Sequence, residues 1–376
     1  MKNYWYVLLA AFLVLWACSS DSSDDTPMTD DDVSMTDDDG SQLTFDRSAM
    51  LTNWADNIIV PSYKDFQSVL VQLINDFESF EQDATLQSLQ DLRTSWMNTY
   101  KSWQHVSMFE IGPAENVGLR LNVNTYPADV ALIEDNITNG GYNLDLPSNR
   151  DSKGFSALDY LLNGIADDDN AILAKYSTDP LKDSNLQYLE DLLNDIKSLT
   201  DGVVTEWEDN YRDTFVSNDG SSATASVDRY SNDFVFYYEK FLRAGKLGIP
   251  LGVFSGVQTP TTVEAFYSPG LSNELFLEGL DAVQNFFNGA SQGESMSSYL
   301  SALDRKDLSD EINAQFDTAR SAVEGLQAFR TELETNNPAV DMLSAYDEVQ
   351  KAVSLLKVDM FSAMSISVDF VDADGD

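Results

Sequence analysis

The stretch TLQSLQDLRTSWMNTYKSWQHVSMFEIGP, residues 85–113, carries the pattern that decides the fold class. Its apolar side chains recur at intervals of three and four, which places them on one face of an α-helix. The positions are Leu86, Leu89, Leu92, Trp96, Tyr100 and Trp103. Glu110 lies seven residues beyond Trp103, so a helix that continued this far would direct its carboxylate towards the core.

The same helical period returns along the rest of the chain, in residues 180–207, 226–248, 273–289, 311–333 and 340–360. Alternation typical of a β-strand is scarce, and SISVDFVD at residues 365–372 is the main candidate. Pro61 interrupts the apolar pattern around it and is expected to kink or split a helix. The sequence therefore predicts an all-α protein of long antiparallel helices.

The composition limits the partners and sites that the chain can have. Lys and Arg total 22 against 63 Asp and Glu, which gives a formal net charge of −41 over 376 residues. Nucleic acid and anionic membrane surfaces would repel such a chain. With one cysteine, Cys18, and one histidine, His105, the chain has no intramolecular disulfide, HExxH zinc helix or four-ligand Cys/His zinc site. A metal site would have to use mainly oxygen ligands.

The N-terminal residues MKNYWYVLLAAFLVLWACSS combine one lysine with an apolar run and small residues around Cys18. The run is shorter than the ~20 residues of a membrane span and has the length of a signal-peptide core. LWAC resembles the bacterial lipobox, so residues 1–17 are predicted to be a lipoprotein signal peptide and Cys18 the lipidated N-terminus. Ser19 is not the aspartate associated with retention in the inner membrane, which favours an outer-membrane lipoprotein.

Residues 18–42 are predicted to be a disordered acidic tether. They are rich in Ser, Asp and Thr, and MTDDDVS at residues 28–34 is repeated as MTDDDGS at residues 35–41. A segment with so little to bury cannot offset the entropy lost on ordering. Such acidic stretches also resemble surface-export signals, and a plain spacer fits equally well. Whether the protein faces the periplasm or the cell exterior therefore stays open.

Several segments, in order, resemble the imelysin-like proteins, also called the peptidase M75 group. They are NWADNIIVPSYKDF, FEIGPAENVGLRLNVNTYPADVALIEDNI, KGFSALDYLLNG, GIPLG with TPTTVEAFYS, and the ending SVDFVDADGD. The resemblance covers about residues 45–376. It implies an all-α fold of two helical bundles, here residues 43–215 and 216–376. It also implies a secreted or lipid-anchored bacterial protein, since members are of that kind, and many of them are associated with iron acquisition.

The signature of that family, Gly-x-His-x-x-Glu, falls on Gly154, Ser156 and Asp159. The glycine is kept, serine replaces the histidine, and aspartate replaces the longer glutamate. A serine hydroxyl is a poor ligand for zinc or ferrous iron and cannot act as a base near pH 7. The resemblance implies that this segment occupies the family's metal or catalytic position with weakened chemistry.

Two interpretations of Ser156 and Asp159 stay open. One is helix-start chemistry, in which the hydroxyl caps free amides and the carboxylate favours the positive end of the helix dipole. The other is a polar cleft between the two halves of the chain. Glu110 would line this cleft as well, together with Asp129 in the first turn of a helix that Pro127 opens.

The other candidate carboxylates also have a structural alternative. A buried Glu110 would need a partner, and Arg120 is the nearest basic residue after it in the sequence. Glu264 could complete the cleft from the second half of the chain, or it could form an ion pair with Arg243 or Lys246.

These features predict a lipid-anchored, non-catalytic binding protein of the cell envelope, associated with iron uptake. Its ligand is unknown, and a weakly held metal ion, iron or calcium, is one candidate. The expected partners are the outer-membrane lipid and an iron-uptake protein, with no nucleic acid, and the oligomeric state is undetermined. The alternatives are an M75-type metallopeptidase and a scaffold that binds another envelope protein and retains a vestigial pocket. The serine at the signature histidine position counts against the peptidase.

Overall fold

The computed structural model describes residues 45–370, and within this range it contains helices and connections but no β-strand. The predicted all-α class is confirmed. The predicted signal peptide, Cys18 and the tether at residues 18–42 lie outside the described residues. The described residues all belong to a single compact unit. The border predicted between residues 215 and 216 falls inside helix α10 and stays a prediction.

The helices fall into long elements and short connecting ones. The α-helices are α1 Arg47–Asn53, α2 Val60–Gln82, α3 Leu86–Gln104, α4 Pro113–Val117, α5 Leu119–Val123, α6 Val130–Asn139, α7 Gly154–Asp159, α8 Asp169–Ser177, α9 Lys182–Glu206, α10 Arg212–Ser217, α11 Ser226–Phe236, α12 Ile249–Leu251, α13 Leu271–Phe287, α14 Met296–Ala302, α15 Lys306–Glu324, α16 Phe329–Thr335, α17 Val340–Ser354 and α18 Phe361–Met364. The π-helical segments are η1 Trp54–Ile59, η3 Tyr160–Gly164, η4 Trp207–Tyr211, η5 Tyr237–Gly248 and η8 Leu355–Met360. Short 3₁₀ turns are η2 Pro147–Ser152, η6 Pro260–Thr262 and η7 Gly289–Ser291.

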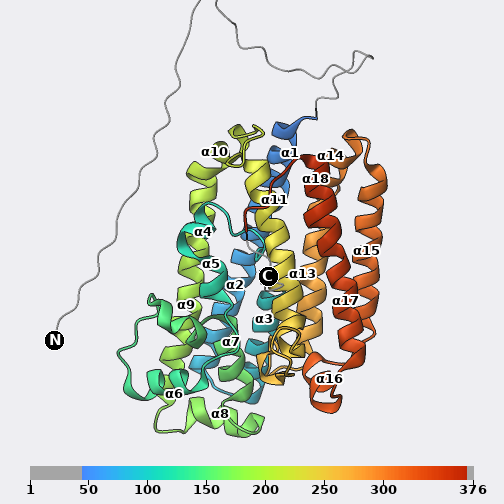
Figure 1. Ribbon diagram of the computed structural model, residues 1–376. Helices are drawn as coiled ribbons and strands as arrows, with labels where there is room; N and C mark the ends of the chain where they lie inside the picture. Colours follow the sequence, from blue (N-terminus) through green and yellow to red (C-terminus); the bar gives the residue numbers. More distant parts are fainter. Residues whose placement is uncertain (1–44, 371–376) are drawn as a thin grey trace, which may run out of the picture. The chain divides into compact units, whose positions relative to one another are not determined.

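The long helices lie side by side along one common direction (Figure 1). Helix α2 packs against α3 and α9, and α13 packs against α3 and α15. Helix α17 lies against α15 and η5. The two halves of the chain therefore meet where α3 contacts α13. None of the helices in the described part of the chain is long and apolar enough to cross a membrane.

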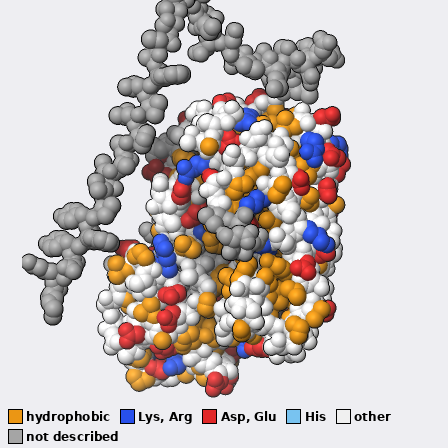
Figure 2. Space-filling view, in the orientation of Figure 1, with side chains coloured by type: hydrophobic (Ala, Val, Ile, Leu, Met, Phe, Trp, Pro, Cys, Tyr) orange, Lys and Arg blue, Asp and Glu red, His pale blue; other side chains and the backbone are white. Residues whose placement is uncertain are grey.

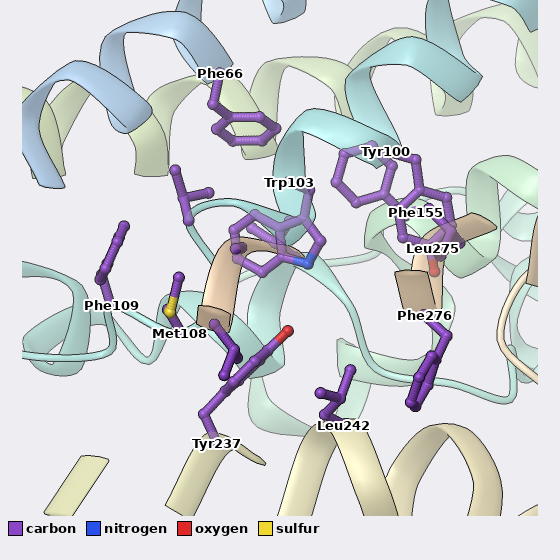
Figure 3. Close-up of a cluster of buried hydrophobic side chains, with 14 of the residues drawn as sticks. Phe66, Tyr100, Trp103, Met108, Phe109, Phe155, Tyr237, Leu242, Leu275 and Phe276 are labelled. Atoms are coloured by element: carbon purple, nitrogen blue, oxygen red, sulfur yellow. The ribbon is translucent and has the colours of Figure 1, made fainter. Parts of the chain in front are cut away.

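One hydrophobic core joins the two halves at this contact (Figure 3). Trp96 and Trp103, which the sequence placed on the buried face of their helix, are 2% and 1% exposed. Tyr100 of the same helix stacks on Phe155 of α7, with ring centroids 4.4 Å apart. Other side chains drawn in Figure 3 are Phe66, Met108, Phe109, Tyr237, Leu242, Leu275 and Phe276. The apolar period of residues 85–104 thus determines which helix face holds the protein together.

Pro61 does not split its helix. Pro61 is the second residue of α2, and the π-helical segment η1 precedes α2 directly. In η1 the amide of Val60 donates to the carbonyl of Ala55, five residues earlier. Because a proline ring collides with the carbonyl four residues before it in a regular α-helix, the wider π turn accommodates Pro61 without a break.

The strand predicted at residues 365–372 is wrong for the part that the structure describes. Residues 365–370 form an irregular segment. The side chain of Asn232 in α11 holds it, donating to the carbonyl of Ser367 at 3.0 Å and accepting from the amide of Asp369 at 3.1 Å. One asparagine side chain thus provides the pair of hydrogen bonds that a neighbouring strand would have supplied.

Gly154 begins α7 with a backbone angle that disfavours other residues. Its φ is +71°, and a Cβ at this position would lie 2.1 Å from the carbonyl oxygen of Val123 at the end of α5. Only glycine tolerates both this conformation and this close approach. The glycine of the signature therefore has a packing function, which brings α7 directly against α5.

We expect the substitution Gly154→Ala to lower the free energy of unfolding by at least about 3 kcal/mol, because it adds a steric overlap to backbone strain. The matched control is Gly202→Ala in α9, where a Cβ would meet nothing within 4 Å. There alanine should stabilise the protein by about 0.5–1 kcal/mol. Urea unfolding of both variants measures the difference. Equal effects would contradict the packing function of Gly154.

Candidate functional site

Ser156 is buried and its hydroxyl donates to the carbonyl oxygen of Thr125, thirty-one residues earlier. It does not cap α7, since the residue before this helix is Lys153 and no side chain caps it. The Lys153 ammonium instead lies 3.0 Å from the carboxylate of Asp195 in α9. Among residues 45–370, no base contacts the Ser156 hydroxyl, and none would activate it as a nucleophile.

Asp159 is 1% exposed, and hydrogen-bond donors surround both of its oxygens. Oδ2 accepts from the amide of Tyr267 at 2.8 Å, and Oδ1 accepts from the Ser268 hydroxyl at 2.7 Å. Asn163, one turn further on, donates to Oδ1 at 3.2 Å. We call Asp159, Asn163, Tyr267 and Ser268 the Asp159 network. It ties the signature helix to the connection that precedes α13.

Burial raises the pKa of Asp159 to about 6, against the lowering effect of these hydrogen bonds and of the positive charge of Arg330. The carboxyl group therefore takes up a proton more readily than an exposed aspartate does. Its oxygens already accept hydrogen bonds from three donors of the chain.

Glu264 lies in a second buried network that also contains the amides of Gln104 and Asn124. Its carboxylate pairs with the Lys246 ammonium, which was one of the two ion pairs proposed for it from the sequence. The Asn124 amide donates to Glu264 Oε1 at 2.7 Å, and Lys246 also donates to Gln104 at 2.9 Å. Burial lowers the pKa of Lys246, and the charge of Glu264 opposes this shift.

The structure brings Ser156, Asp159 and Glu264 into one region through residues of the first half of the chain. Asn124 contacts Glu264, and its neighbour Thr125 accepts from Ser156. The Tyr100 hydroxyl donates to Asn124 at 2.7 Å. Burial raises the pKa of Tyr100, and the negative charges of Glu264 and Asp159 add to this effect. Ser156 and Glu264 are thus linked through the neighbouring residues Asn124 and Thr125, and Asp159 acts on the same region through its charge.

Glu110 belongs to a different cluster. Helix α3 ends at Gln104, so the expected continuation of the helix to Glu110 is wrong. The chain folds back through turns at residues 105–108. The Glu110 carboxylate accepts from the backbone amide of Arg120 at 2.8 Å, while the Arg120 guanidinium pairs with Asp233 at 3.3 Å. Arg120 is therefore a partner of Glu110, as expected, but through its backbone.

Glu110 and Asp233 both line a cavity of about 280 Å³ beside α11. Burial raises the pKa of Glu110 to about 7, although the charge of Arg120 acts in the opposite direction. Burial also raises the pKa of Asp233. Two carboxyl groups with raised pKa values thus lie beside one arginine, Asp233 at its guanidinium and Glu110 at its backbone amide.

Asp129 lies apart from both clusters. It is exposed and precedes α6, where its side chain accepts from the amide of Leu132 at 3.0 Å. This is the ordinary contact of a residue that caps the first turn of a helix. Its role is accounted for by this contact.

Four further residues of these clusters were not predicted from the sequence: Asp233, Gln104, Tyr267 and Ser268. Asp233 could have been found, because it follows Tyr230 by three residues and precedes Tyr237 by four on an apolar helical face. Gln104 has a comparable signal, since it follows Tyr100 by four residues on the same helix, whereas Tyr267 and Ser268 have none. Ser268 and Tyr267 reach Asp159 across more than a hundred residues, through packing that no local pattern specifies.

The described residues do not fit the metal that the family signature implies. They contain no group of three or more His, Cys, Asp or Glu side chains placed to hold a metal ion. Asp159 already accepts from three donors, and Ser156 donates its proton to a carbonyl. On the face drawn in Figure 2, acidic and basic side chains are interspersed with apolar ones and form no single acidic patch.

Comparison with known proteins gives a consistent result. A family model described as Imelysin (Peptidase_M75) matches residues 59–356. Iron-regulated protein A of Synechococcus elongatus is 25% identical over 305 residues, which cover 77% of this chain and 79% of that protein.

Two solved structures share the fold. A protein from Parabacteroides distasonis, provisionally described as an iron-regulated protein A precursor, has a TM-score of 0.68 and 19% identity, and covers 85% of this chain and 96% of its own. An imelysin-like protein from Psychrobacter arcticum has a TM-score of 0.69 and 16% identity, and the match covers 86% of this chain and 97% of that protein.

The raised pKa of Glu110 predicts how the substitution Glu110→Gln changes stability with pH. Because the folded-state pKa of about 7 lies above the ordinary value of 4.5, folding favours the protonated form. This contribution is fully present at low pH and is lost as the pH rises from 4.5 through 7. Glutamine cannot ionise, so wild-type protein should lose about 1–3 kcal/mol relative to the variant between about pH 5 and 8.

Urea unfolding of both proteins at several pH values measures this difference. The same substitution at Glu311, which is exposed on α15, is the matched control. A difference between wild type and Glu110→Gln that does not change with pH would contradict the prediction.

Proposed function

The chain belongs to the imelysin family, peptidase M75, and on that premise we propose that it is a lipid-anchored, non-catalytic binding protein of the cell envelope that takes part in iron uptake. The non-catalytic role, the link to iron and the anchor rest on different observations. Each can therefore fail without the others.

The Asp159 network is the observation that carries the non-catalytic role. Hydrolysis by a metallopeptidase requires a metal held by enough strong ligands to lower the pKa of its bound water. Here the two altered signature positions serve the fold: Asp159 holds the connection before α13, and Ser156 holds the carbonyl of Thr125. Binding a metal at Asp159 would require breaking hydrogen bonds that satisfy a buried carboxylate.

The link to iron rests on relatives. The similar protein of Synechococcus elongatus is named iron-regulated protein A, and the structure from Parabacteroides distasonis is described in the same terms. The anchor rests on the LWAC sequence that ends at Cys18, the single cysteine of the chain. An acidic tether after this cysteine would hold the folded part away from the membrane.

We expect no appreciable peptidase activity from the purified full-length chain. Unfolded protein substrates incubated with it and with added zinc or iron should show no cleavage that a chelator abolishes. The wild type and the Asp159→Ala variant should give the same background in this assay. Robust cleavage by the wild type that is lost in Asp159→Ala would overturn the non-catalytic role.

We expect a bacterial strain that lacks this gene to grow more slowly than its parent under iron limitation. The wild-type gene and a Ser156→Ala variant should both restore growth, since Ser156 has no catalytic role in the proposal. A Cys18→Ser variant should fail to restore it, because the protein would lose its anchor. Mass spectrometry of the native protein should find an acylated Cys18.

These outcomes separate the two parts of the prediction. Equal growth of the deletion strain and its parent at low iron would contradict the role in iron uptake. Restored growth with Cys18→Ser, or an unmodified mature N-terminus at another residue, would contradict the anchor alone.

A further inference from the structure

A second and larger cavity lies next to the one that Glu110 lines. It has a volume of about 510 Å³ and lies between α4, the α10 region and the first turn of α11. Its walls include Glu115, Tyr211, Phe215, Ser226, Arg229 and Tyr230. Arg229 is the one Lys or Arg among the residues that line it, and it also lines the smaller cavity.

Arg229 uses only part of its hydrogen-bonding capacity. Its Nη2 donates to both oxygens of Glu115, at 2.7 and 2.6 Å. Its Nε and Nη1 donate to no other residue in the described part of the chain. Because a guanidinium normally engages a carboxylate through two nitrogens, this one retains an edge that can bind a second anion. Both side chains are about half exposed, so their ion pair is weak and can be displaced.

Ser226 supplies an independent indication of a ligand. It is 7% exposed and lines the large cavity, yet its hydroxyl has no hydrogen-bond partner among the described residues. It lies three residues before Arg229 in α11, so the two side chains share one face of the helix. Ala225, which precedes α11, has no side chain that could cap it. The positive end of the helix dipole lies at the same place, and Asp228 is the acidic residue of this first turn.

We propose that this cavity binds the carboxylate of an aromatic monocarboxylic acid. The ligand's carboxylate would bind the free edge of Arg229 and accept from the Ser226 hydroxyl, in competition with Glu115. The aromatic side chains of Tyr211 and Phe215 would pack against its ring. A single guanidinium balances a single negative charge. Glu110 and Asp233 in the neighbouring cavity disfavour polyanions such as phosphate or a tricarboxylate.

This proposal requires neither iron nor a lipid anchor, and its test uses iron-free probes. Calorimetric titration of the purified full-length chain with 2,3-dihydroxybenzoate should give saturable binding. The neutral amide, 2,3-dihydroxybenzamide, should bind at least about tenfold more weakly, because it lacks the charge that strengthens hydrogen bonds to Arg229.

Two substitutions should act in opposite directions. Arg229→Gln should weaken binding of the acid by about tenfold or more, because it removes the charge that the carboxylate meets. Glu115→Gln should strengthen binding by about two- to fivefold, because the competing carboxylate is removed. Ser226→Ala should weaken binding by a smaller factor. Arg305→Gln, which removes an exposed arginine paired with Asp307, is the matched control and should change nothing.

Circular dichroism of each variant establishes that it is folded. The proposal is overturned if the acid does not bind, or if acid and amide bind equally. It is also overturned if Glu115→Gln and Arg229→Gln change the affinity in the same direction.

Discussion

A buried carboxylate must receive its hydrogen bonds from the protein. Asp159 is such a carboxylate, and the two halves of the chain meet around it. Its partners Tyr267 and Ser268 come from the connection before α13, so the first half of the chain is fastened to the second at this point. Gly154 lets α7 approach α5 closely enough for the Ser156 hydroxyl to reach the Thr125 carbonyl. In this chain the signature segment organises the packing of helices.

Two buried carboxylates of the structure, Glu264 and Asp159, have different kinds of partner. Glu264 meets a buried ammonium, Lys246, and its charge is compensated directly. Asp159 meets neutral donors, with Arg330 acting only through its field, so burial dominates and its pKa rises. A neutral donor shell can hold a carboxylate in place while leaving it able to gain a proton.

The sequence predicted the parts of the fold that depend on neighbours within one helix. The spacing of Trp96 and Trp103 identified the buried face of α3 correctly, because apolar residues that recur with the helical period lie on the face that the helix buries. The pairing of Glu264 with Lys246 was also foreseeable, since the two lie on either side of one connection.

Predictions failed where the backbone departs from a regular helix. The turns at residues 105–108 place Glu110 in another environment, and the side chain of Asn232 replaces a strand partner near the C-terminus. Tyr267 and Ser268, which donate to Asp159, come from a distant segment, and no local pattern encodes them.

The π-helical segment η5 holds more residues per turn than an α-helix does. If a relative lacked one residue there and formed an α turn instead, the helix faces on either side of the change would keep nearly the same directions. Side chains inside the segment, Lys246 among them, would take new positions between those fixed ends, so the ion pair of Lys246 with Glu264 depends on the length of η5. A deletion in η5 would therefore change the chemistry of the buried centre while the surrounding helices stayed in place, and a count of identical residues would not record the change.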